Sequence, residues 1–309
     1  MRQEKKYLPL EELKYFEKKF PNVFEQYDLM LESNDKNGMS KSSISYSLAR
    51  YFLMQVYHRS EKSMRKNDIW ECMYLILTYC EWKKSKQVYT FSNELFQMIS
   101  HSEEYSIDGA IFDYLPYDSF YLENEMNNVV RGIFVTHAKE QTSNVLVFVL
   151  LFEEHQFCVL TLNLNEVTSA KQFLNKIQYS YLTEEEVRSV LNFAIQACMY
   201  LCAKNCDVVE NAYQKSIHHP TPSHSNRFSE IRKWDVGFRI AVKHNGTHSS
   251  NYHSENAQIR RNRPRQHWRK AHWHTYWVGP ARKRKEIKFI APILVNDIDD
   301  EIPVVVHPS

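Results

Sequence analysis

The side chains most capable of chemistry are concentrated in residues 263–277 (RPRQHWRKAHWHTYW). Four basic groups, four aromatic rings and three histidines fall within these fifteen residues. Cations pair with phosphates and flat rings stack on bases, so this composition suits single-stranded nucleic acid. Arginine and tryptophan are also common anchors of protein interfaces, so a peptide groove fits the same residues. A third interpretation, basic groups in solvent with the tryptophans packed on the core, stays equally open.

The histidines allow two further interpretations, a zinc site and an acid–base catalyst. Six of them could be considered as ligands: His218, His219, His224, His267, His272 and His274. Zinc sites normally show cysteine or carboxylate partners at fixed spacing, and the surrounding arginines repel a cation, so we expect no metal and no cofactor. His272 and His274 with Lys270 could in principle cleave RNA by proton transfer. Because no second group is fixed by spacing, we expect a protein that is not an enzyme.

A second aromatic segment lies at residues 113–121 (DYLPYDSFY). Two acids and four rings surround a proline there, and Tyr114, Tyr117 and Phe120 could form a sticky concave edge for a peptide. The same pattern also fits a core strand followed by a turn. The sequence leaves both open and leans slightly towards the core.

Scarce glycine excludes several enzyme classes. The chain has six glycines, no two closer than nine positions, whereas dinucleotide fingerprints, Walker loops and nucleophile elbows need closely paired glycines. Charge is divided unevenly: residues 260–288 hold eleven basic groups and one glutamate, and the remaining chain holds 28 basic and 36 acidic groups. A basic end on an acidic body predicts a polyanionic or acidic partner.

Periodicity predicts an α+β fold with the helices first. Helical patterns cover residues 10–32 with a break at Pro21, then 43–58, 68–82 and 93–99. Extended segments follow at 109–114, 118–122, 129–139, 145–152 and 157–164, and their short polar links predict an antiparallel meander. A capping box at Thr183 and Glu186 starts a long buried helix that reaches residue 203. Further strands are expected at 236–242 and 286–295, with Pro292 at an edge or an end.

These elements suggest three parts. They are a helical N-terminal part (1–105), a part with the meander and long helix (106–214) and a basic aromatic C-terminal part (215–309), which could also form one continuous domain. Cys198, Cys202 and Cys206 recur every fourth residue, so we expect one buried stripe on the helix. The longest apolar run has eight residues, which is too short for a membrane span. With no cysteine motif for bridging, a cytoplasmic protein is the simplest expectation.

The C-terminal residues resemble the signature of a known family. Arg263–Pro264, residues 269–279 (RKAHWHTYWVG), residues 285–288 (KEIK) and residues 292–296 (PILVN) are similar to the C-terminal motif of the second described anti-CRISPR family directed at the type V-A effector nuclease, or of its homologues on mobile elements. The likeness is strongest over about 35 residues, and His267 and Trp268 lie in an apparent two-residue insertion.

The resemblance implies a non-enzymatic regulator. Members are understood to recognise the N-terminal polypeptide of the nuclease as it emerges during translation and to cause destruction of its message. The implied partners are that nascent peptide, the ribosome with its translated mRNA, and a host nuclease, with no membrane involved. A metal-independent ribonuclease using His272 and His274, and a nucleic-acid-binding accessory protein of a phage or plasmid, are the alternatives.

Two sets of residues follow from these arguments. The expected nucleic-acid or ribosome contacts are Arg260, Arg261, Arg263, Arg265, Arg269, Lys270, Arg282, Lys283 and Arg284. The expected peptide contacts are His272, Trp273, His274, Tyr276, Trp277, Tyr114, Tyr117 and Phe120.

Overall fold

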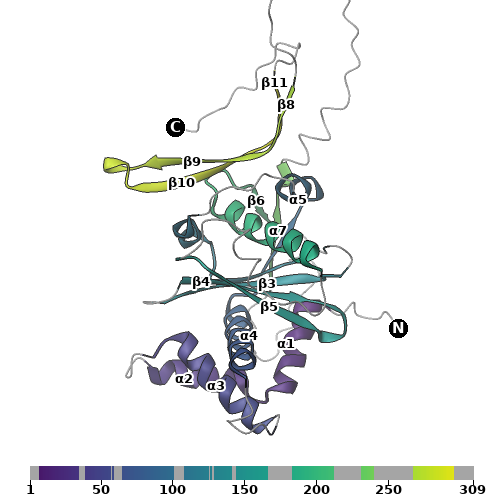
Figure 1. Cartoon of the computed structure of the whole chain (residues 1–309), viewed down its shortest axis with the longest axis vertical. Coiled ribbons are helices and arrows are strands. Elements are labelled where there is room, and N and C mark those ends of the chain that lie inside the picture. Colours follow the sequence, from purple (N-terminus) through teal and green to yellow (C-terminus); the bar gives the residue numbers. More distant parts are fainter. Residues whose placement is uncertain are drawn as a thin grey trace, which may run out of the picture.

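The computed structural model describes residues 7–34, 39–56, 58, 65–100, 108–124, 126, 129–140, 144–165, 183–211, 231–239 and 267–295. A β-sheet forms the middle layer (Figure 1). Among the described residues, helices α1–α4 form the layer on one face of this sheet, and α5 and α7 cover the other. A two-stranded ribbon near the C-terminus, yellow in Figure 1, lies across the outer side of the second helical layer. The expected α+β architecture is confirmed.

The N-terminal helices follow the predicted pattern. They are α1 (Leu8–Lys19), α2 (Val23–Asn34), α3 (Lys41–Gln55) and α4 (Lys66–Ser85). The break at Pro21 separates α1 from α2, and the left-handed Asn22 (φ 60°) makes the turn between them. Helix α4 lies directly on the sheet: Trp82 is completely buried and packs against Phe134 and Tyr121.

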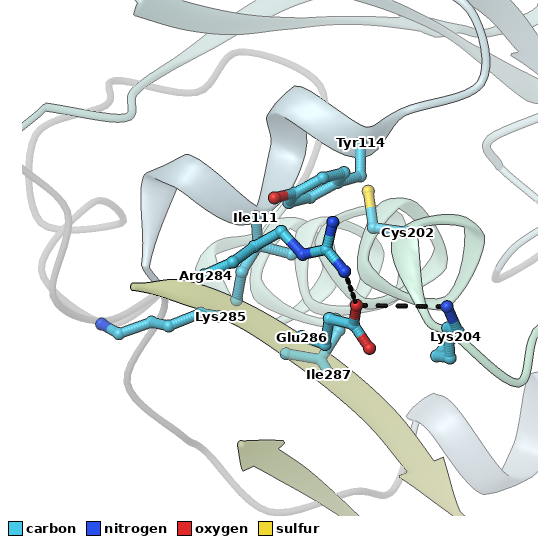
Figure 2. Close-up of a pocket in the computed structure, with 8 residues that line it drawn as sticks. All are labelled: Ile111, Tyr114, Cys202, Lys204, Arg284, Lys285, Glu286 and Ile287. Carbon is cyan, nitrogen blue, oxygen red and sulfur yellow. Dashed lines mark hydrogen bonds and ion pairs between the residues drawn. The ribbon is translucent and has the colours of Figure 1, made fainter. Parts of the chain in front are cut away.

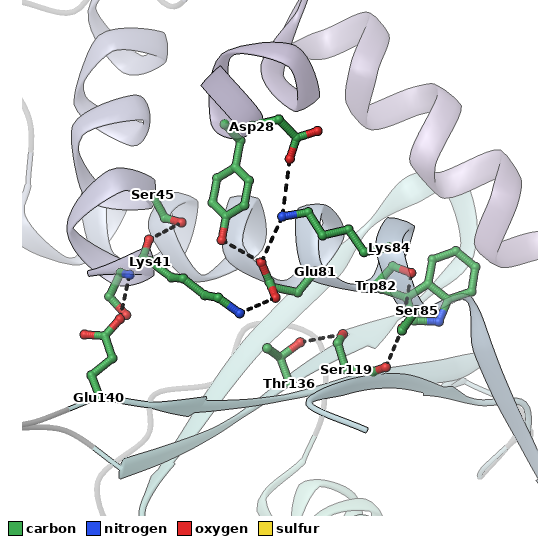
Figure 3. A network of polar contacts seen from close by, with 12 residues as sticks. Asp28, Lys41, Ser45, Glu81, Trp82, Lys84, Ser85, Ser119, Thr136 and Glu140 are labelled. Atoms are coloured by element: carbon green, nitrogen blue, oxygen red, sulfur yellow. Dashed lines mark hydrogen bonds and ion pairs between the residues drawn. The ribbon is translucent and has the colours of Figure 1, made fainter. Parts of the chain in front are cut away.

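A polar network ties α2 and α3 to α4 (Figure 3). The Glu81 carboxylate on α4 accepts hydrogen bonds from Tyr27 Oη (2.8 Å) and Lys41 Nζ (2.7 Å). Lys84 bridges the same carboxylate, at 3.4 Å, to Asp28 at 3.3 Å. Burial acts to raise the pKa of Glu81, but Lys41, Lys84 and the Tyr27 hydroxyl together lower it. The ionised carboxylate therefore joins the helices of this layer.

The central sheet has seven strands in the order β5-β4-β3-β2-β1-β7-β6. Strands β2 (Ser119–Leu122), β3 (Gly132–Lys139), β4 (Asn144–Leu151) and β5 (Phe157–Asn163) form the predicted antiparallel meander. Strand β1 (Gln87–Phe91), which sequence reasoning missed, lies between β2 and β7 and is parallel to both. The sheet is therefore mixed and contains strands from all three expected parts of the chain.

Two strands at the far side of the sheet differ from expectation. Strands β6 (Val208–Glu210) and β7 (Arg232–Val236) pair with each other, and β6 was not predicted. The strand expected at 236–242 is wrong over residues 236–239, because β7 ends at Val236, where that strand should begin; residues 240–242 lie outside the described residues. Gly237 has φ +82°, a left-handed conformation that turns the chain out of the sheet, and residues 238–239 are helical.

Both faces of the meander are buried, and successive side chains of β4 alternate between the two hydrophobic cores. On β4, Leu146, Phe148 and Leu150 point into the core beneath the second helical layer. Val147 and Val149 point into the core beneath α1–α4. A strand that is covered on both sides reads as a continuous apolar run, which explains the eight-residue run at 145–152.

The second helical layer contains α5 (Asn93–Ser100) and α7 (Glu184–Cys202). The capping box is confirmed: Thr183 Oγ1 accepts from the Glu186 amide at 3.3 Å, and the Glu186 carboxylate accepts from the Thr183 amide at 2.7 Å. The prediction that Cys198, Cys202 and Cys206 form one buried stripe is wrong for Cys206. Helix α7 ends at Cys202, and Cys206 lies beyond it and is exposed. No helix among the described residues is both long and apolar enough to cross a membrane.

Residues 109–114 were expected to be extended, and this prediction is wrong. They form a 3-10 helix, η2 (Gly109–Tyr114), whose start is capped by the Asp108 carboxylate accepting from the Ala110 amide at 3.1 Å. Gly109 is required there, since a Cβ would lie 2.2 Å from the Leu164 carbonyl oxygen. This helix packs against α7 and positions Tyr114 beside the C-terminal ribbon (Figure 2).

The basic aromatic segment forms the ribbon. Strands β9 (His272–Val278) and β10 (Arg284–Ile290) pair antiparallel, joined through the 3-10 turn η5 (Pro280–Arg282), and the short strands β8 (His267–Arg269) and β11 (Ile293–Val295) continue the ribbon. The single strand expected at 286–295 is therefore two strands, interrupted at Ala291 and Pro292.

Candidate binding site on the C-terminal ribbon

The ribbon is attached to α7 by aromatic and amide contacts. Trp273 Nε1 donates to Gln196 Oε1 at 3.1 Å, and the Phe289 ring lies 5.6 Å from Tyr200 and 5.1 Å from Trp273. Asn205, just beyond α7, brackets the Phe289 backbone: its Nδ2 donates to the carbonyl at 2.8 Å, and its Oδ1 accepts from the amide at 3.1 Å. These contacts fix the position of β10 on the body of the protein.

One edge of β10 faces the body and is only partly paired. The Ile287 carbonyl accepts from the Lys204 amide at 3.0 Å, and Asn205 holds Phe289, so the backbone groups of these two residues point away from β9. Backbone groups of alternate residues point the same way in an antiparallel strand, so the N–H and C=O of Lys285 also point away from β9. Neither group has a partner within the described part of the chain. This segment is an open strand edge.

A cleft of about 230 Å³ lies beside this open edge (Figure 2). It is bounded by η2, by the end of α7 and by β10. Its lining residues are Ile111, Tyr114, Cys202, Lys204, Arg284, Lys285, Glu286 and Ile287. Figure 2 shows the Arg284 guanidinium extending below the Tyr114 ring towards Glu286. The cleft therefore has apolar and aromatic walls with both signs of charge at its rim.

Ion pairs organise the charged groups around the cleft. Arg284 Nη2 donates to Glu286 Oε1 at 2.6 Å, and Lys204 Nζ lies 4.0 Å from the same oxygen. On the other side of the strand, Lys285 Nζ donates to Asp108 Oδ2 at 2.5 Å. This hydrogen bond from Lys285 is the main reason that the pKa of Asp108 is lowered. The β10 backbone is thus held to the start of η2 as well as to α7.

The sulfur in the cleft is not activated. Burial is the largest cause that raises the pKa of the Cys202 thiol well above its usual value, and Cys198 and Cys206 raise it further. A protonated thiol is a poor nucleophile, so Cys202 contributes an apolar wall.

The three expected peptide contacts within residues 113–121 lie in different surroundings. Tyr114 lines the cleft and is 50% exposed. Phe120 is completely buried and packs edge-to-face on Tyr89, so the core, the other interpretation of residues 113–121, holds for this ring. Tyr117 is half-buried against the same core.

Strand β9 places its aromatic side chains on its two opposite faces. Trp273 faces α7 and is half-buried, whereas Trp277, four positions further along β9 and on the same face, is 53% exposed. His272, His274 and Tyr276 share the other face, and the rings of His274 and Tyr276 are 5.7 Å apart.

The expected basic contacts are only partly described. Arg260, Arg261, Arg263 and Arg265 lie outside the described residues, and of Arg269 the structure gives the strand β8 alone. Lys270, Arg282, Lys283 and Arg284 are exposed. Arg282 and Lys283 sit at the turn of the ribbon, and Lys270 lies at its opposite end, before β9.

The histidines lie on a strand face. His272 Nδ1 is 3.1 Å from the Lys270 carbonyl oxygen, a geometry in which the ring nitrogen donates. Within the described residues, no group of three or more histidine, cysteine or acidic side chains is arranged to hold a metal ion. His218, His219 and His224 lie outside those residues, as does the His267 side chain.

A second groove lies far from the ribbon, between α2 and α3. It measures about 450 Å³ and is lined by Gln26, Leu29, Met30, Ser47, Leu48 and Tyr51. It carries no charged side chain, in contrast to the cleft at β10.

Sequence reasoning missed most of the cleft. Ile111 and Cys202 lie 91 positions apart in the sequence, and no local pattern joins them to Lys204 or Glu286. The alternation of Trp273, Thr275 and Trp277 did contain a period-two signal that could have identified β9.

Sheet, helical layers and ribbon together define a mixed α+β protein whose fold is that of a known anti-CRISPR protein. A solved structure described as "Crystal structure of AcrVA2" matches it with a TM-score of 0.60, over 94% of this chain and 99% of that chain, at 17% sequence identity. Residues 89–297 match the family model AcrVA2-like, described as the anti-CRISPR type V subtype A2 family. The protein belongs to this family, since the model covers more than half of the chain. No curated protein matches the chain.

The family match confirms the anti-CRISPR resemblance of the C-terminal motif. It begins within β1 and ends just beyond β11, so it includes the sheet, α7 and the whole ribbon. The cleft and the open edge of β10 therefore belong to the part of the chain that defines the family.

Proposed function

We propose that this protein recognises the nascent N-terminal polypeptide of the type V-A CRISPR effector nuclease during translation and causes degradation of its mRNA. Family membership supports an anti-CRISPR role directed at type V-A systems. The observation that carries the peptide step is the open edge of β10 beside a cleft. The remaining partners in this proposal are the ribosome, the translated mRNA and a host nuclease, all in the bacterial cytoplasm.

A nascent chain suits an open strand edge. A polypeptide that has just emerged has no tertiary structure, so its backbone can pair with an exposed strand. Main-chain hydrogen bonds to Lys285 would supply affinity, and a side chain inserted beside Tyr114 and Ile111 would supply specificity. A volume of about 230 Å³ accommodates one or two side chains, which fits recognition of a short motif.

The charges at the cleft rim add a further preference. Lys204 and Arg284 share Glu286, which leaves one excess positive charge among the three groups. An acidic side chain on the peptide would pair with Lys204, which is 64% exposed. Peptides with an acidic residue next to an apolar one fit this arrangement best.

A reporter transcript tests the proposal. A reporter that carries the first few dozen codons of the effector nuclease should lose its transcript when this protein is expressed. Synonymous recoding of those codons should preserve the loss, and a compensated frameshift that changes the peptide should abolish it. Rescue by synonymous recoding would mean that RNA sequence is read, and the proposal would be abandoned.

The strand edge can be tested with a matched pair of variants. Lys285→Pro removes the outward N–H group, whereas Lys285→Met keeps that group. Both variants lose the ion pair with Asp108 and the ammonium group beside the Trp277 ring. We expect the proline variant to leave the transcript intact and the methionine variant to act as the unmodified protein does. Equal loss of activity in both would assign the role to the side chain instead.

Naked RNA separates this proposal from the ribonuclease alternative. The purified protein is expected to leave a naked transcript intact. Cleavage that His272→Ala abolishes would replace the proposal with direct RNA hydrolysis.

A further inference from the structure

The turn of the ribbon is a second surface, separate from the cleft. Strand β9 ends at Val278, and the chain returns through η5 to β10. Gly279, Ala281 and Arg282 all have left-handed backbone conformations, with φ of 80°, 57° and 51°, and the Arg282 amide donates to the Gly279 carbonyl at 3.0 Å. Nothing lies within 4 Å of the position where a Gly279 Cβ would be. The turn is thus internally fixed and open to solvent.

An exposed aromatic ring stands next to this turn. Trp273 and Trp277 are on the same face of β9, but only Trp273 reaches α7. Trp277 lies beyond the end of that contact and is 53% exposed, with Lys285 Nζ 4.8 Å from its ring centroid. The ribbon therefore overhangs the body and presents an indole ring next to a cation.

Two cations at the turn have no acidic partner among the residues that the structure describes. Glu286 pairs with Arg284, and Asp108 pairs with Lys285. Arg282 and Lys283 are exposed and make no ion pair in the described part of the chain. They follow the exposed Trp277, at the end of β9, by five and six positions, so positive charge and a flat ring lie at the same end of the ribbon.

We infer that this turn binds single-stranded RNA, with Trp277 stacking on a base while Arg282 and Lys283 contact the adjacent phosphates. Stacking on an exposed ring needs an unpaired base, because a base inside a duplex already has neighbours on both faces. Single-stranded DNA offers the same chemistry, and RNA is chosen because the proposed function places the protein on a translated message. The inference goes beyond that function, since it assigns a ligand other than the peptide to a surface other than the cleft.

Fluorescence anisotropy with a 5′-fluorescein-labelled twenty-nucleotide poly-uridine RNA tests the inference. Trp277→Ala should weaken binding by about 5- to 150-fold, which is the range for loss of one stacked base. Trp277→Phe should retain most of the affinity. Trp70→Ala, which removes another partly exposed tryptophan on α4, should leave binding unchanged. Unchanged binding by Trp277→Ala would overturn the stacking role.

Salt dependence tests the phosphate contacts. The double variant Arg282→Ala, Lys283→Ala should reduce the slope of log affinity against log salt by about 1.4, since each single-strand phosphate contact contributes about 0.7. The matched double variant Lys18→Ala, Lys66→Ala removes two exposed lysines from α1 and α4 and should leave the slope unchanged. Equal slopes in both double variants would overturn the assignment.

Competing ligands identify the class that is bound. Unlabelled single-stranded RNA should displace the probe, and a duplex RNA of the same length should displace it poorly. Equal competition by the duplex or by a poly-glutamate peptide would overturn single-strand recognition, and stronger competition by poly-deoxythymidine would assign the site to DNA. No binding of the probe at low salt would also refute the inference, while the transcript reporter would still decide the peptide proposal.

Discussion

Phe289 should hold the ribbon on the protein, and its removal can be evaluated from the structure. The ring is 3% exposed and contacts Tyr200 and Trp273. Burial of a phenylalanine contributes about 1.5–3 kcal/mol, and each aromatic pair adds about 0.5–1.5 kcal/mol. Phe289→Ala should therefore lower the free energy of unfolding by about 3–5 kcal/mol, the usual cost of such a truncation. Trp277→Ala, in the same ribbon, should cost less than about 1 kcal/mol because that ring is 53% exposed.

Urea denaturation measures the change in the free energy of unfolding, and hydrogen exchange locates it. Amides of β9 and β10 should lose protection in Phe289→Ala before amides of α4 do, because α4 lies on the opposite face of the sheet. If Phe289→Ala and Trp277→Ala lowered the free energy of unfolding equally, or if the amides of α4 lost as much protection as those of the ribbon, the ribbon would not be held through Phe289. The packing of Phe289 on α7 would then not be what positions β10.

Two other changes test the core and the polar network. Gly132→Ala should destabilise the protein by about 1–3 kcal/mol, since the new Cβ would lie 1.9 Å from Tyr121 Oη. The midpoint of thermal unfolding should therefore be lower in this variant. An unchanged midpoint would contradict the close approach of β2 and β3. The folded protein lowers the pKa of Glu81 below its usual 4.5, so Glu81 stabilises the fold above pH 4.5 and this contribution is lost as pH falls through the lower folded value. Glu81→Gln should flatten urea stability against pH in that acidic window, and an unaltered profile would show that the Lys41 and Tyr27 contacts carry no net stabilisation.

Local signals predicted the helices and the meander well. Apolar residues at helical spacing identified α1 to α5, and the Thr183–Glu186 capping box located the first turn of α7. The meander strands follow each other in the chain, so short polar links were sufficient to order β2 to β5. In each case the information that determines the element lies within the element or next to it.

The missing elements depend on distant partners. Strand β1 follows α4 after the single left-handed residue Lys86, and its neighbours in the sheet are residues 119–122 and 232–236. The cleft depends on the same kind of contact, since η2, the end of α7 and β10 meet only after the sheet and ribbon are assembled. Residues 109–114 were expected to be extended, but periodicity does not distinguish strand from helix over so short a segment, and the Asp108 cap starts a 3-10 helix there.

The central place of β1 has a consequence for how the chain folds as it is made. Ser92, directly after β1, donates a hydrogen bond to Gly237, directly after β7, across 145 positions of sequence. During synthesis β1 can pair with β2 early, but its other edge stays unpaired until residues 232–236 leave the ribosome. Such long-range pairing slows folding and leaves an unpaired, aggregation-prone strand edge exposed until it is complete. The sheet is therefore complete only after residues 232–236 have been synthesised and have paired with β1.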